Sequence, residues 1–460
     1  MIETPLTGFE SDLREVATAF GVDDSLRIKH LFKESPDRLI NTFVINGQSY
    51  AYGNLIPETN DQIVKKRLIK RYAKLSLYKA LSRSLGKELP WGALTGIRPT
   101  KLAYSQIEET GEFIDFFQSV MKVSEEKTSL VKKILETQKG LYEKNNLNTD
   151  LFVFIPFCPT RCKYCSFISQ DIKSARGKVD EYVETLVKEI NESAQLIKKL
   201  RSIYIGGGTP VSLNIAQLDK VLCAIDKINS GVEYTVEAGR PDVITEENLK
   251  LLKEHGVTRV CVNPQTFNQK TLDLIGRNHT ESQTIEKYHL AKKYFDVNMD
   301  LIAGLPEEDF NDFKYSLDKT ISLKPDDITV HTLCLKKGSY LTQSTSRLSV
   351  NEIDEMVNYA HKTLGENDYR PYYLYRQKYA AGNLENTGYA LKGKECVYNI
   401  DAMEETTSVV ACGANAISKV VTSNFERIER YASPKDVLSY LGKIDTIIQK
   451  KKELFLEREI

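Results

Sequence analysis

The chain has 460 residues, 63 basic and 63 acidic side chains, and a hydrophobic fraction of 41%. At roughly 100–200 residues per domain this length suggests two to four domains, and the composition excludes extensive disorder. The zero net charge argues against the basic excess of a protein that lives on nucleic acid or anionic lipid. The N-terminus lacks a basic start and an apolar core, and no apolar run approaches the ~20 residues of a membrane span. We therefore expect a soluble cytoplasmic protein.

Residues 1–145 have the pattern of an α+β accessory domain. Asn46-Gly47 separates two strand-like runs, 42–45 and 48–52, and predicts a type I′ hairpin. Apolar residues every three or four positions predict a helix over 61–86. The other face of this helix carries Lys65, Lys66, Lys70, Lys74 and Arg83. Such a face is usually only solvated, and docking of a polyanion is the alternative.

A loop over 91–101 contains the only tryptophan, two glycines, a proline and two cations. This loop either serves an anionic ligand or forms a turn between domains.

Residues 150–335 alternate between short β runs and amphipathic helices. Strands are expected at 151–156, 202–206, 234–238, 259–263, 298–303 and 328–333, with helices between them, such as 179–200, 215–228 and 246–255. Six βα units predict parallel strands with right-handed crossovers. Because a closed TIM barrel has eight units, we expect an α/β fold with a partial (βα)6 TIM-like barrel, whose ligands gather at the carboxyl ends of the strands.

After about residue 336 the alternation stops. A helix is expected over 351–365, and a charged helix is expected from about residue 434. We interpret 336–460 as a smaller α+β domain that covers the mouth of the barrel.

The eight cysteines are unevenly placed. Five are isolated among apolar residues and are expected to be small buried hydrophobes: Cys223, Cys261, Cys334, Cys396 and Cys412. Cys158, Cys162 and Cys165 share one loop after the first barrel strand. Three thiolates at this spacing can bind three irons of a cubane cluster. Zinc is the competing interpretation, but a structural zinc site requires four ligands and commonly has two Cys-x2-Cys pairs, and the sequence has no second pair. The fourth iron would have no protein ligand, which indicates a catalytic cluster and not one that only carries electrons.

This Cys-x3-Cys-x2-Cys loop, with Tyr164 before the third cysteine, resembles that of the radical S-adenosylmethionine (SAM) superfamily. The resemblance implies a [4Fe–4S] cluster held by the three cysteines. Its open iron would chelate the amino and carboxylate groups of SAM, and the reduced cluster would split SAM into a 5′-deoxyadenosyl radical. The protein would supply positioning and exclusion of water.

Later motifs resemble those of the oxygen-independent coproporphyrinogen III oxidase group. They are Gly-Gly-Gly-Thr-Pro over 206–210, Val-Glu-Ala-Gly-Arg-Pro around Glu237, Asn-Pro-Gln around Gln265, Gly-Arg-Asn-His around Arg277, and Asn-Met-Asp-Leu around Asp300. The resemblance places nine residues around one SAM molecule, or two: Phe152, Tyr164, Gly207, Gly208, Thr209, Glu237, Gln265, Arg277 and Asp300. The residue types agree, because carboxylates accept hydrogen bonds from ammonium or ribose groups and Arg pairs with carboxylates.

The flanking segments 94–101 and 375–390 resemble those of HemZ-type coproporphyrinogen dehydrogenases. The resemblance implies an oxidoreductase of anaerobic haem biosynthesis that decarboxylates coproporphyrinogen III to protoporphyrinogen IX, with an electron donor of the flavodoxin or ferredoxin type. Radical abstraction needs no general base, so no catalytic acid–base pair is nominated. Candidate cations for the four substrate carboxylates are Arg98, Lys101, Arg161, Arg370, Arg376 and Lys378.

One position departs from the oxidase pattern. The well-defined oxidase has a fourth cysteine two residues after the third, and Phe167 occupies that position here. The alternatives are therefore a haem-binding chaperone of the same family, or radical-SAM haem degradation or methyl transfer. A tRNA-modifying enzyme ranks last.

Overall fold

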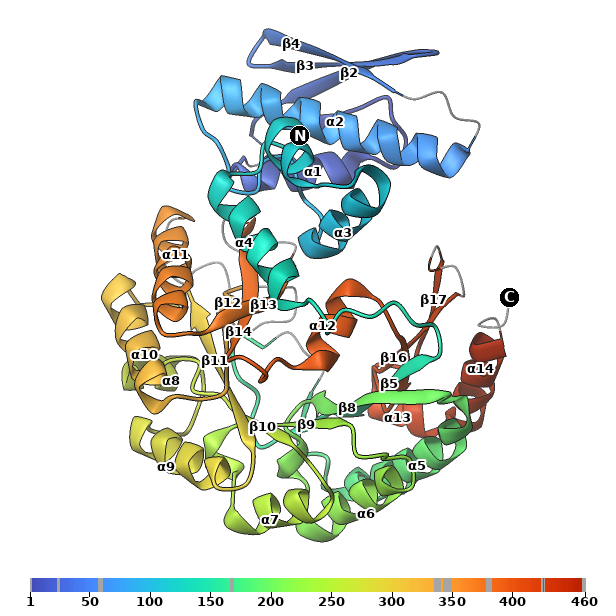
Figure 1. Ribbon diagram of the computed structural model, residues 1–460, viewed down its shortest axis with the longest axis vertical. Coiled ribbons are helices and arrows are strands. Elements are labelled where there is room, and N and C mark those ends of the chain that lie inside the picture. Colours follow the sequence, from blue (N-terminus) through green and yellow to red (C-terminus); the bar gives the residue numbers. More distant parts are fainter. Residues whose placement is uncertain are drawn as a thin grey trace. The chain divides into compact units, whose positions relative to one another are not determined.

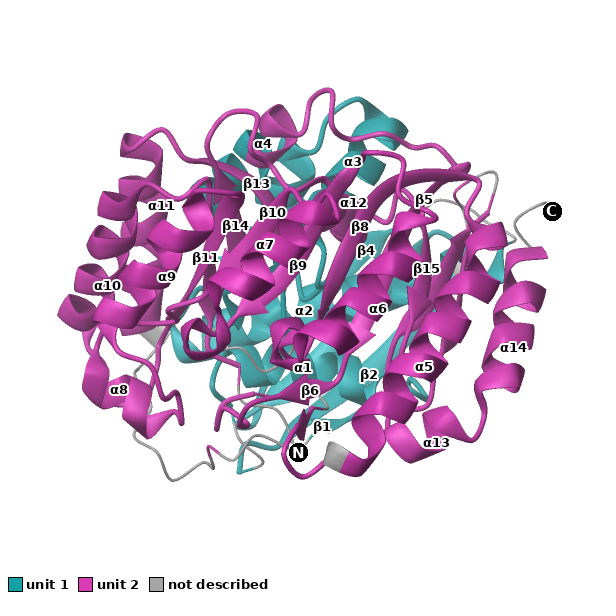
Figure 2. Ribbon diagram, turned by 90° about the horizontal axis from the view of Figure 1, so that it is seen from below, with its two compact units in different colours: residues 1–133, 375–385 teal, residues 134–374, 386–460 magenta. Residues whose placement is uncertain are grey.

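The computed structural model describes residues 2–22, 25–56, 61–165, 169–334, 341, 350–377, 383–422, 425 and 427–456. The chain forms two compact units, residues 1–133 with 375–385 and residues 134–374 with 386–460, shown in teal and magenta in Figure 2. The division into domains at 1–145, 150–335 and 336–460 stays a prediction. Within the described ranges, every helix is too short or too polar to cross a membrane.

The first unit is built on a four-stranded sheet in the order β1-β2-β3-β4. Its elements are β1 (Ile2–Glu3), α1 (Glu10–Ala19), β2 (Ile28–Ser35), β3 (Arg38–Ile45), β4 (Gln48–Leu55), α2 (Gln62–Leu85), α3 (Pro99–Thr110) and α4 (Glu125–Thr137). The predicted hairpin is confirmed, because Asn46 and Gly47 both have positive φ, 50° and 77°, as a type I′ turn requires. The predicted long helix is α2.

The basic face of α2 is largely used within the same unit. Lys65 forms an ion pair with Glu34 at 2.5 Å, and Lys70 forms one with Asp12 at 2.7 Å. Lys74 lies 3.9 Å from the same Asp12 carboxylate. Because these cations already have acidic partners, the case for a polyanion on this face is weakened.

The loop around Trp91 is a structural anchor of the first unit. The Trp91 indole N–H donates to Glu385 at 2.6 Å, and Lys127 donates to the other oxygen of Glu385 at 2.8 Å. The Arg376 guanidinium stacks 5.0 Å over the Trp91 ring and donates to the carbonyls of Leu94 and Asn383. Arg376 is buried by these contacts. Its nomination as a substrate-binding cation is therefore wrong.

The second unit contains a sheet whose described strands run β13-β14-β12-β11-β10-β9-β8-β5-β15-β16-β17. Its strands are β5 (Asn148–Ile155), β8 (Lys199–Gly207), β9 (Glu233–Gly239), β10 (Arg259–Val262), β11 (Asp296–Ala303), β12 (Asp327–Thr332), β13 (Arg370–Arg376), β14 (Glu385–Ala390), β15 (Ser408–Cys412), β16 (Ile417–Val421) and β17 (Ile428–Ala432). Between β5 and α5 in the chain, β6 (Phe157–Cys158) and β7 (Gln170–Asp171) form a separate, short parallel pair. The helices are α5 (Arg176–Ser193), α6 (Ile215–Asp226), α7 (Glu246–Glu254), α8 (Gln269–Leu274), α9 (Glu281–Lys292), α10 (Phe310–Leu323), α11 (Val350–Glu366), α12 (Val397–Glu404), α13 (Val437–Leu441) and α14 (Ile444–Leu456).

The six predicted barrel strands are β5, β8, β9, β10, β11 and β12, and each pairs in parallel with the next. In Figure 1 helices α5, α6, α7, α9 and α10 lie around the outside of these strands. In the described chain, β15 pairs with the outer edge of β5 and β14 pairs with that of β12. The expected α/β fold with a partial (βα)6 barrel is confirmed, and strands from the last third of the chain extend its sheet.

The prediction of a helix through residue 200 was too long. Helix α5 ends at Ser193, and β8 begins at Lys199, because this segment pairs with β5 from Asn148 onward. Tertiary pairing here overrides a helical pattern.

Strand alternation separates an apolar outer face from a polar interior. Outward residues such as Val236, Val260 and Val297 pack in the core beneath the helices. Their neighbours turn inward, and several are polar: Thr235, Glu237, Cys261, Asn263, Asn298, Asp300, Thr329 and His331. Helix α12 lies on this inner side of the strands (Figure 1). Buried polar groups need partners, and several of these side chains hydrogen-bond one another.

Three of the five isolated cysteines are buried as expected. Cys261, Cys396 and Cys412 are buried and Cys334 is half-buried, but Cys223 is exposed on α6. The prediction for Cys223 was wrong because Leu218, Val221, Leu222 and Ile225 form the buried stripe of this helix.

Glu308, just before α10, offers a test of pH-dependent stability. It is buried, and Thr266 donates a 2.5 Å hydrogen bond to its carboxylate. Burial raises the pKa of Glu308 from 4.5 to about 7, so the neutral form is favoured in the folded state and its stabilising effect is lost as pH rises through about 7. Because Glu308→Gln stays neutral, we expect it to remove roughly 3 kcal/mol of the fall in unfolding free energy between pH 5 and pH 8.5. Urea unfolding at both pH values checks this, and parallel pH profiles for variant and wild type would contradict it.

Candidate cofactor-binding site

The cysteine loop follows β5 and is fastened to its neighbours by backbone hydrogen bonds. Cys158 ends β6, and a turn joins the Cys165 amide to the Cys162 carbonyl at 3.1 Å. The Lys163 amide donates to Ile275 at 2.9 Å, which ties the loop to the segment after α8. Cys162 is buried and the other two thiols are half-buried. Phe167, which stands where the oxidase has a fourth cysteine, lies outside the described residues.

The three sulfurs are not gathered as a single zinc ion would require. Tetrahedral zinc with 2.3 Å bonds places sulfurs about 3.8 Å apart. Among the described residues, the one trio of metal-ligating groups whose atoms all lie within 4.8 Å is Asp219, Cys223 and His255, on the outer helices. At least two of the sulfurs of Cys158, Cys162 and Cys165 therefore lie more than 4.8 Å apart.

The glycine-rich segment at the end of β8 packs directly on the cysteine loop. The amides of Gly208 and Thr209 donate to the carbonyls of Ile155 and Phe157, both at 2.7 Å. The Thr209 hydroxyl also lies 3.6 Å from the Cys158 sulfur. Burial raises the pKa of the Cys158 thiol, and the Thr209 hydroxyl acts in the opposite direction. The predicted glycine motif and the predicted cysteine motif are therefore neighbours in space.

Glycine is required at this contact because side chains would collide. A Cβ on Gly208 would lie 2.5 Å from the Phe157 carbonyl oxygen, and one on Gly207 would lie 2.8 Å from the Phe154 ring. Gly207 also has φ of +109°, a conformation that favours glycine. The backbone here forms a cradle that other residues would fill.

Glu237 lies two residues before the end of β9, on the face that points into the barrel. The Tyr204 hydroxyl donates to its carboxylate at 2.6 Å, and burial raises the pKa of Glu237 to about 7 although this hydrogen bond lowers it. The Tyr204 ring stacks on Tyr398 of α12 with centroids 4.4 Å apart. Phe152 lies 6.1 Å from Tyr398 and 6.2 Å from Tyr204. Phe152, Tyr204 and Tyr398 therefore form an aromatic cluster beside the Glu237 carboxylate.

Asp300 is held by two amide side chains. Asn263 donates to one oxygen and Asn298 to the other, both at 2.7 Å. His331 on β12 lies 3.6 Å from the same carboxylate. The backbone amide of Gln265 donates to the Asp300 carbonyl at 2.9 Å, so the two residues are neighbours.

Arg277 joins this group to the cysteine loop. Its guanidinium donates to the Asn263 carbonyl at 2.8 Å and to the Tyr164 hydroxyl at 3.1 Å. Tyr164 itself packs against Ile275, Ile302 and other apolar residues at the ends of α8 and β11.

Two buried polar atoms indicate that a polar ligand belongs here. In the described part of the chain, the Gln265 side-chain oxygen has no hydrogen-bond partner although the residue is buried, and the Arg277 Nε also lacks one. Buried groups normally find partners, and exceptions concentrate at functional sites. Gln265 also has φ of 68°, a strained conformation for a residue other than glycine. Together with three thiols and a glycine cradle, these features fit an iron–sulfur cluster and a polar nucleotide.

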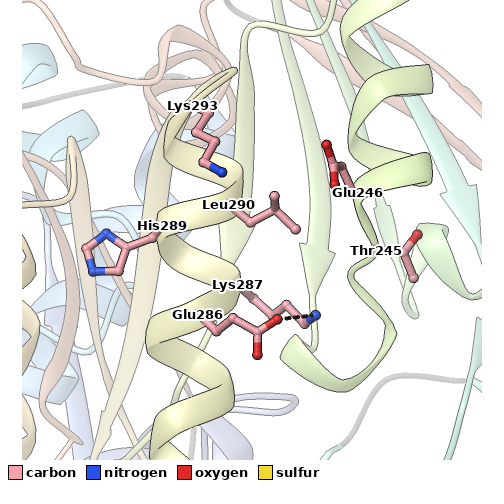
Figure 3. A pocket seen from close by; sticks show the side chains of 7 residues that line it. All are labelled: Thr245, Glu246, Glu286, Lys287, His289, Leu290 and Lys293. Atoms are coloured by element: carbon pink, nitrogen blue, oxygen red, sulfur yellow. Dashed lines mark hydrogen bonds and ion pairs between the residues drawn. The ribbon is translucent and has the colours of Figure 1, made fainter.

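A separate groove of about 590 Å³ lies on the outer layer, between the start of α7 and α9. Figure 3 shows its lining residues, which include Glu246, Glu286 and Lys287. It contains none of the predicted site residues, so it belongs to the helical surface and not to the barrel interior.

Comparison with known proteins agrees with this geometry. Residues 152–320 match the model of the Radical SAM superfamily. The chain is 38% identical over 370 residues to the oxygen-independent coproporphyrinogen-III oxidase-like protein HemZ of Bacillus subtilis, a match that covers 76% of this chain and 74% of that protein. The chain belongs to the oxygen-independent coproporphyrinogen-III oxidase-like family of radical SAM proteins. Membership implies a [4Fe–4S] cluster and SAM as cofactors.

Other similar proteins carry two different names. The heme chaperone HemW of Lactococcus lactis is 32% identical over 259 residues, which cover 54% of this chain and 64% of that protein. The solved structure of coproporphyrinogen III oxidase (HemN) from Escherichia coli superposes with a TM-score of 0.54 at 21% identity, over 65% of this chain and 69% of that one. That structural match shows a shared fold.

The motifs missed several side chains that share the interior. Tyr204 could have been found, because it stands two residues before Gly206 and residues two apart in a strand point to the same face. Arg240 stands inside the quoted Glu237 motif, and Asn263 stands two residues before Gln265. Tyr398 has no local signal, since α12 brings it from a distant part of the chain.

Proposed function

We propose that this protein is a radical SAM oxidoreductase that converts coproporphyrinogen III to protoporphyrinogen IX by two oxidative decarboxylations. The observation that carries this proposal is the 38% identity to HemZ across most of both chains. It is supported by the polar side chains of the barrel interior, where Glu237 and Asp300 are held by hydrogen bonds from Tyr204, Asn263 and Asn298.

In the proposed site, Cys158, Cys162 and Cys165 bind three irons and leave the fourth for SAM. When both are bound, the cluster and SAM would together supply a 5′-deoxyadenosyl radical. The backbone at Gly207 and Gly208, with Thr209, meets the methionyl end, since a backbone without Cβ allows close approach. Glu237, Gln265, Arg277 and Asp300 offer the matching hydrogen-bonding groups, and Phe152 and Tyr164 offer apolar surface.

The chemistry on each propionate balances with one external acceptor. A hydrogen atom leaves the β-carbon to form 5′-deoxyadenosine, the carboxylate leaves as carbon dioxide, and one electron passes to a one-electron acceptor. The product is a vinyl group. Reduction of the cluster needs a low-potential donor, for which we propose a flavodoxin or ferredoxin type.

Arg98, Lys101, Arg161 and Arg370 remain proposed partners of the substrate carboxylates. Lys378 lies outside the described residues.

The second candidate function is a haem-binding chaperone. The 32% identity to HemW of Lactococcus lactis favours it, as does Phe167 in place of a fourth cysteine. A chaperone would keep the cysteine loop but bind haem without turnover of a porphyrinogen.

One anaerobic experiment separates the two functions. The reconstituted protein is incubated with SAM, a low-potential reductant, an electron acceptor and coproporphyrinogen III, and products are analysed by mass spectrometry. A product lighter than coproporphyrinogen III by two carbon dioxide molecules and the hydrogens removed with them supports the enzyme, provided that 5′-deoxyadenosine is formed in proportion. Stoichiometric haem binding without that product supports the chaperone.

A further inference from the structure

Arg240 is a buried cation that faces the cysteine loop. It follows β9 directly and is 3% exposed. One nitrogen of its guanidinium, Nη1, donates to the Thr160 carbonyl at 3.0 Å and to the Thr160 hydroxyl at 2.7 Å, and it lies 3.9 Å from the Cys162 sulfur. Thr160 stands between the first two cysteines. The guanidinium therefore contacts both the backbone of the loop and one proposed iron ligand.

Asp242 fixes the direction of this cation. Its two oxygens accept from Nε at 3.0 Å and from Nη2 at 2.7 Å, which leaves Nη1 for the loop. Such bidentate pairing is the geometry that an arginine fork favours and a lysine cannot reproduce. The positive edge of the pair points to the sulfur and the negative edge points away.

Two other titratable side chains, His279 and Arg277, interact electrostatically with this pair. His279 lies near the pair, but burial lowers its pKa to about 3, so it is neutral at pH 7. Arg277 donates to the Tyr164 hydroxyl and to the Asn263 carbonyl, and its charge also acts on Cys162 and Asp242 without a direct hydrogen bond to either. Arg240 is the guanidinium whose contact with the thiol of Cys162 is direct.

We propose that Arg240, oriented by Asp242, is a positioning residue that raises the reduction potential of the [4Fe–4S] cluster through its N–H contact with Cys162. This inference rests on the proposed cofactor site and adds a residue to it. The physical reason is electrostatic: reduction adds a negative charge to the cluster, and a buried cation or an N–H donor to its sulfur stabilises that charge.

The test is a redox titration of the cluster by electron paramagnetic resonance, in reconstituted protein without SAM or porphyrinogen. For Arg240→Gln we expect a more negative potential, with the ratio of reduced to oxidised cluster at fixed potential falling about tenfold, which is 59 mV for one electron. For Arg240→Lys, which keeps the charge, the potential should lie between that of Arg240→Gln and that of wild type. For Asp242→Asn, which removes the negative edge, we expect a shift in the positive direction.

A merely structural anchor predicts a different outcome. If Arg240 only held the loop at Thr160, the Arg240 and Asp242 variants would lose iron together and their remaining clusters would keep the wild-type potential, which would overturn the inference. If Arg240→Gln binds too little iron to titrate, an Asp242→Asn potential at or below wild type overturns it just as well. Lys250→Gln, on the exposed face of α7, is the matched control and should change nothing.

The same experiment distinguishes failure of the cofactor site from failure of this inference. Absence of any cluster in reconstituted wild-type protein would reject the cofactor site itself. A wild-type cluster whose potential is insensitive to Arg240 and Asp242 would reject only the role proposed for this pair.

Discussion

Replacing Cys162 with alanine is expected to remove the iron–sulfur cluster and to reduce 5′-deoxyadenosine formation to the background of cluster-free protein. Cys162 is the most buried of the three thiols, and it lies beside the Arg240 guanidinium at 3.9 Å. A site that binds three irons with three thiolates has no spare ligand, so two remaining cysteines cannot hold the cubane. The measurements are the iron and sulfide content after anaerobic reconstitution and the yield of 5′-deoxyadenosine from SAM.

Cys223→Ala is the matched control for this experiment. Cys223 is an exposed thiol on α6, and its sulfur lies 3.8 Å from Asp219 on the same helix, outside the barrel interior. This variant should keep the wild-type iron content and SAM cleavage. Full 5′-deoxyadenosine formation by Cys162→Ala would show that the radical chemistry assigned to this loop is wrong.

Local signals predicted the parts of the fold that local physics determines. The hairpin at Asn46-Gly47 depends on two residues that tolerate positive φ, and the barrel strands depend on short apolar runs between helical segments. The end of α5 was misplaced because helical periodicity continues past Ser193, whereas pairing with β5 decides where β8 begins. Such pairing joins residues far apart in sequence, so the pattern around residue 200 could not reveal it.

The candidate site divides in the same way. Its cysteines and glycines stand in short motifs, so their sequence spacing carries the prediction. The side chains that orient these residues do not stand in such motifs. Tyr398 joins the interior from α12, and Asn263 and Asn298 hold Asp300 through side-chain bonds that no spacing rule encodes. Arg376 shows the opposite error, since composition marks it as a substrate cation but packing under Trp91 makes it structural.

Replacing Gly208 with alanine is expected to separate the glycine segment from the cysteine loop and to abolish SAM binding. The new Cβ would lie 2.5 Å from the Phe157 carbonyl oxygen and 2.9 Å from that of Ile155. Neither carbonyl can withdraw freely, because each accepts a 2.7 Å hydrogen bond from the glycine segment itself. Relieving the overlap should cost about 1–3 kcal/mol and break the contact that brings the two motifs together.

The prediction is checked by calorimetric titration of the reconstituted Gly208→Ala protein with SAM, alongside its iron content and urea midpoint. Gly177→Ala is the matched control, because a Cβ at Gly177 would meet no other atom within 4 Å and this residue stands in α5, where alanine is the better helix former. The control should bind SAM as wild type does, with unchanged or slightly higher stability. If Gly208→Ala instead binds SAM with wild-type affinity, the methionyl end of SAM does not lie against this backbone. The cradle would then serve only to pack β8 against the cysteine loop.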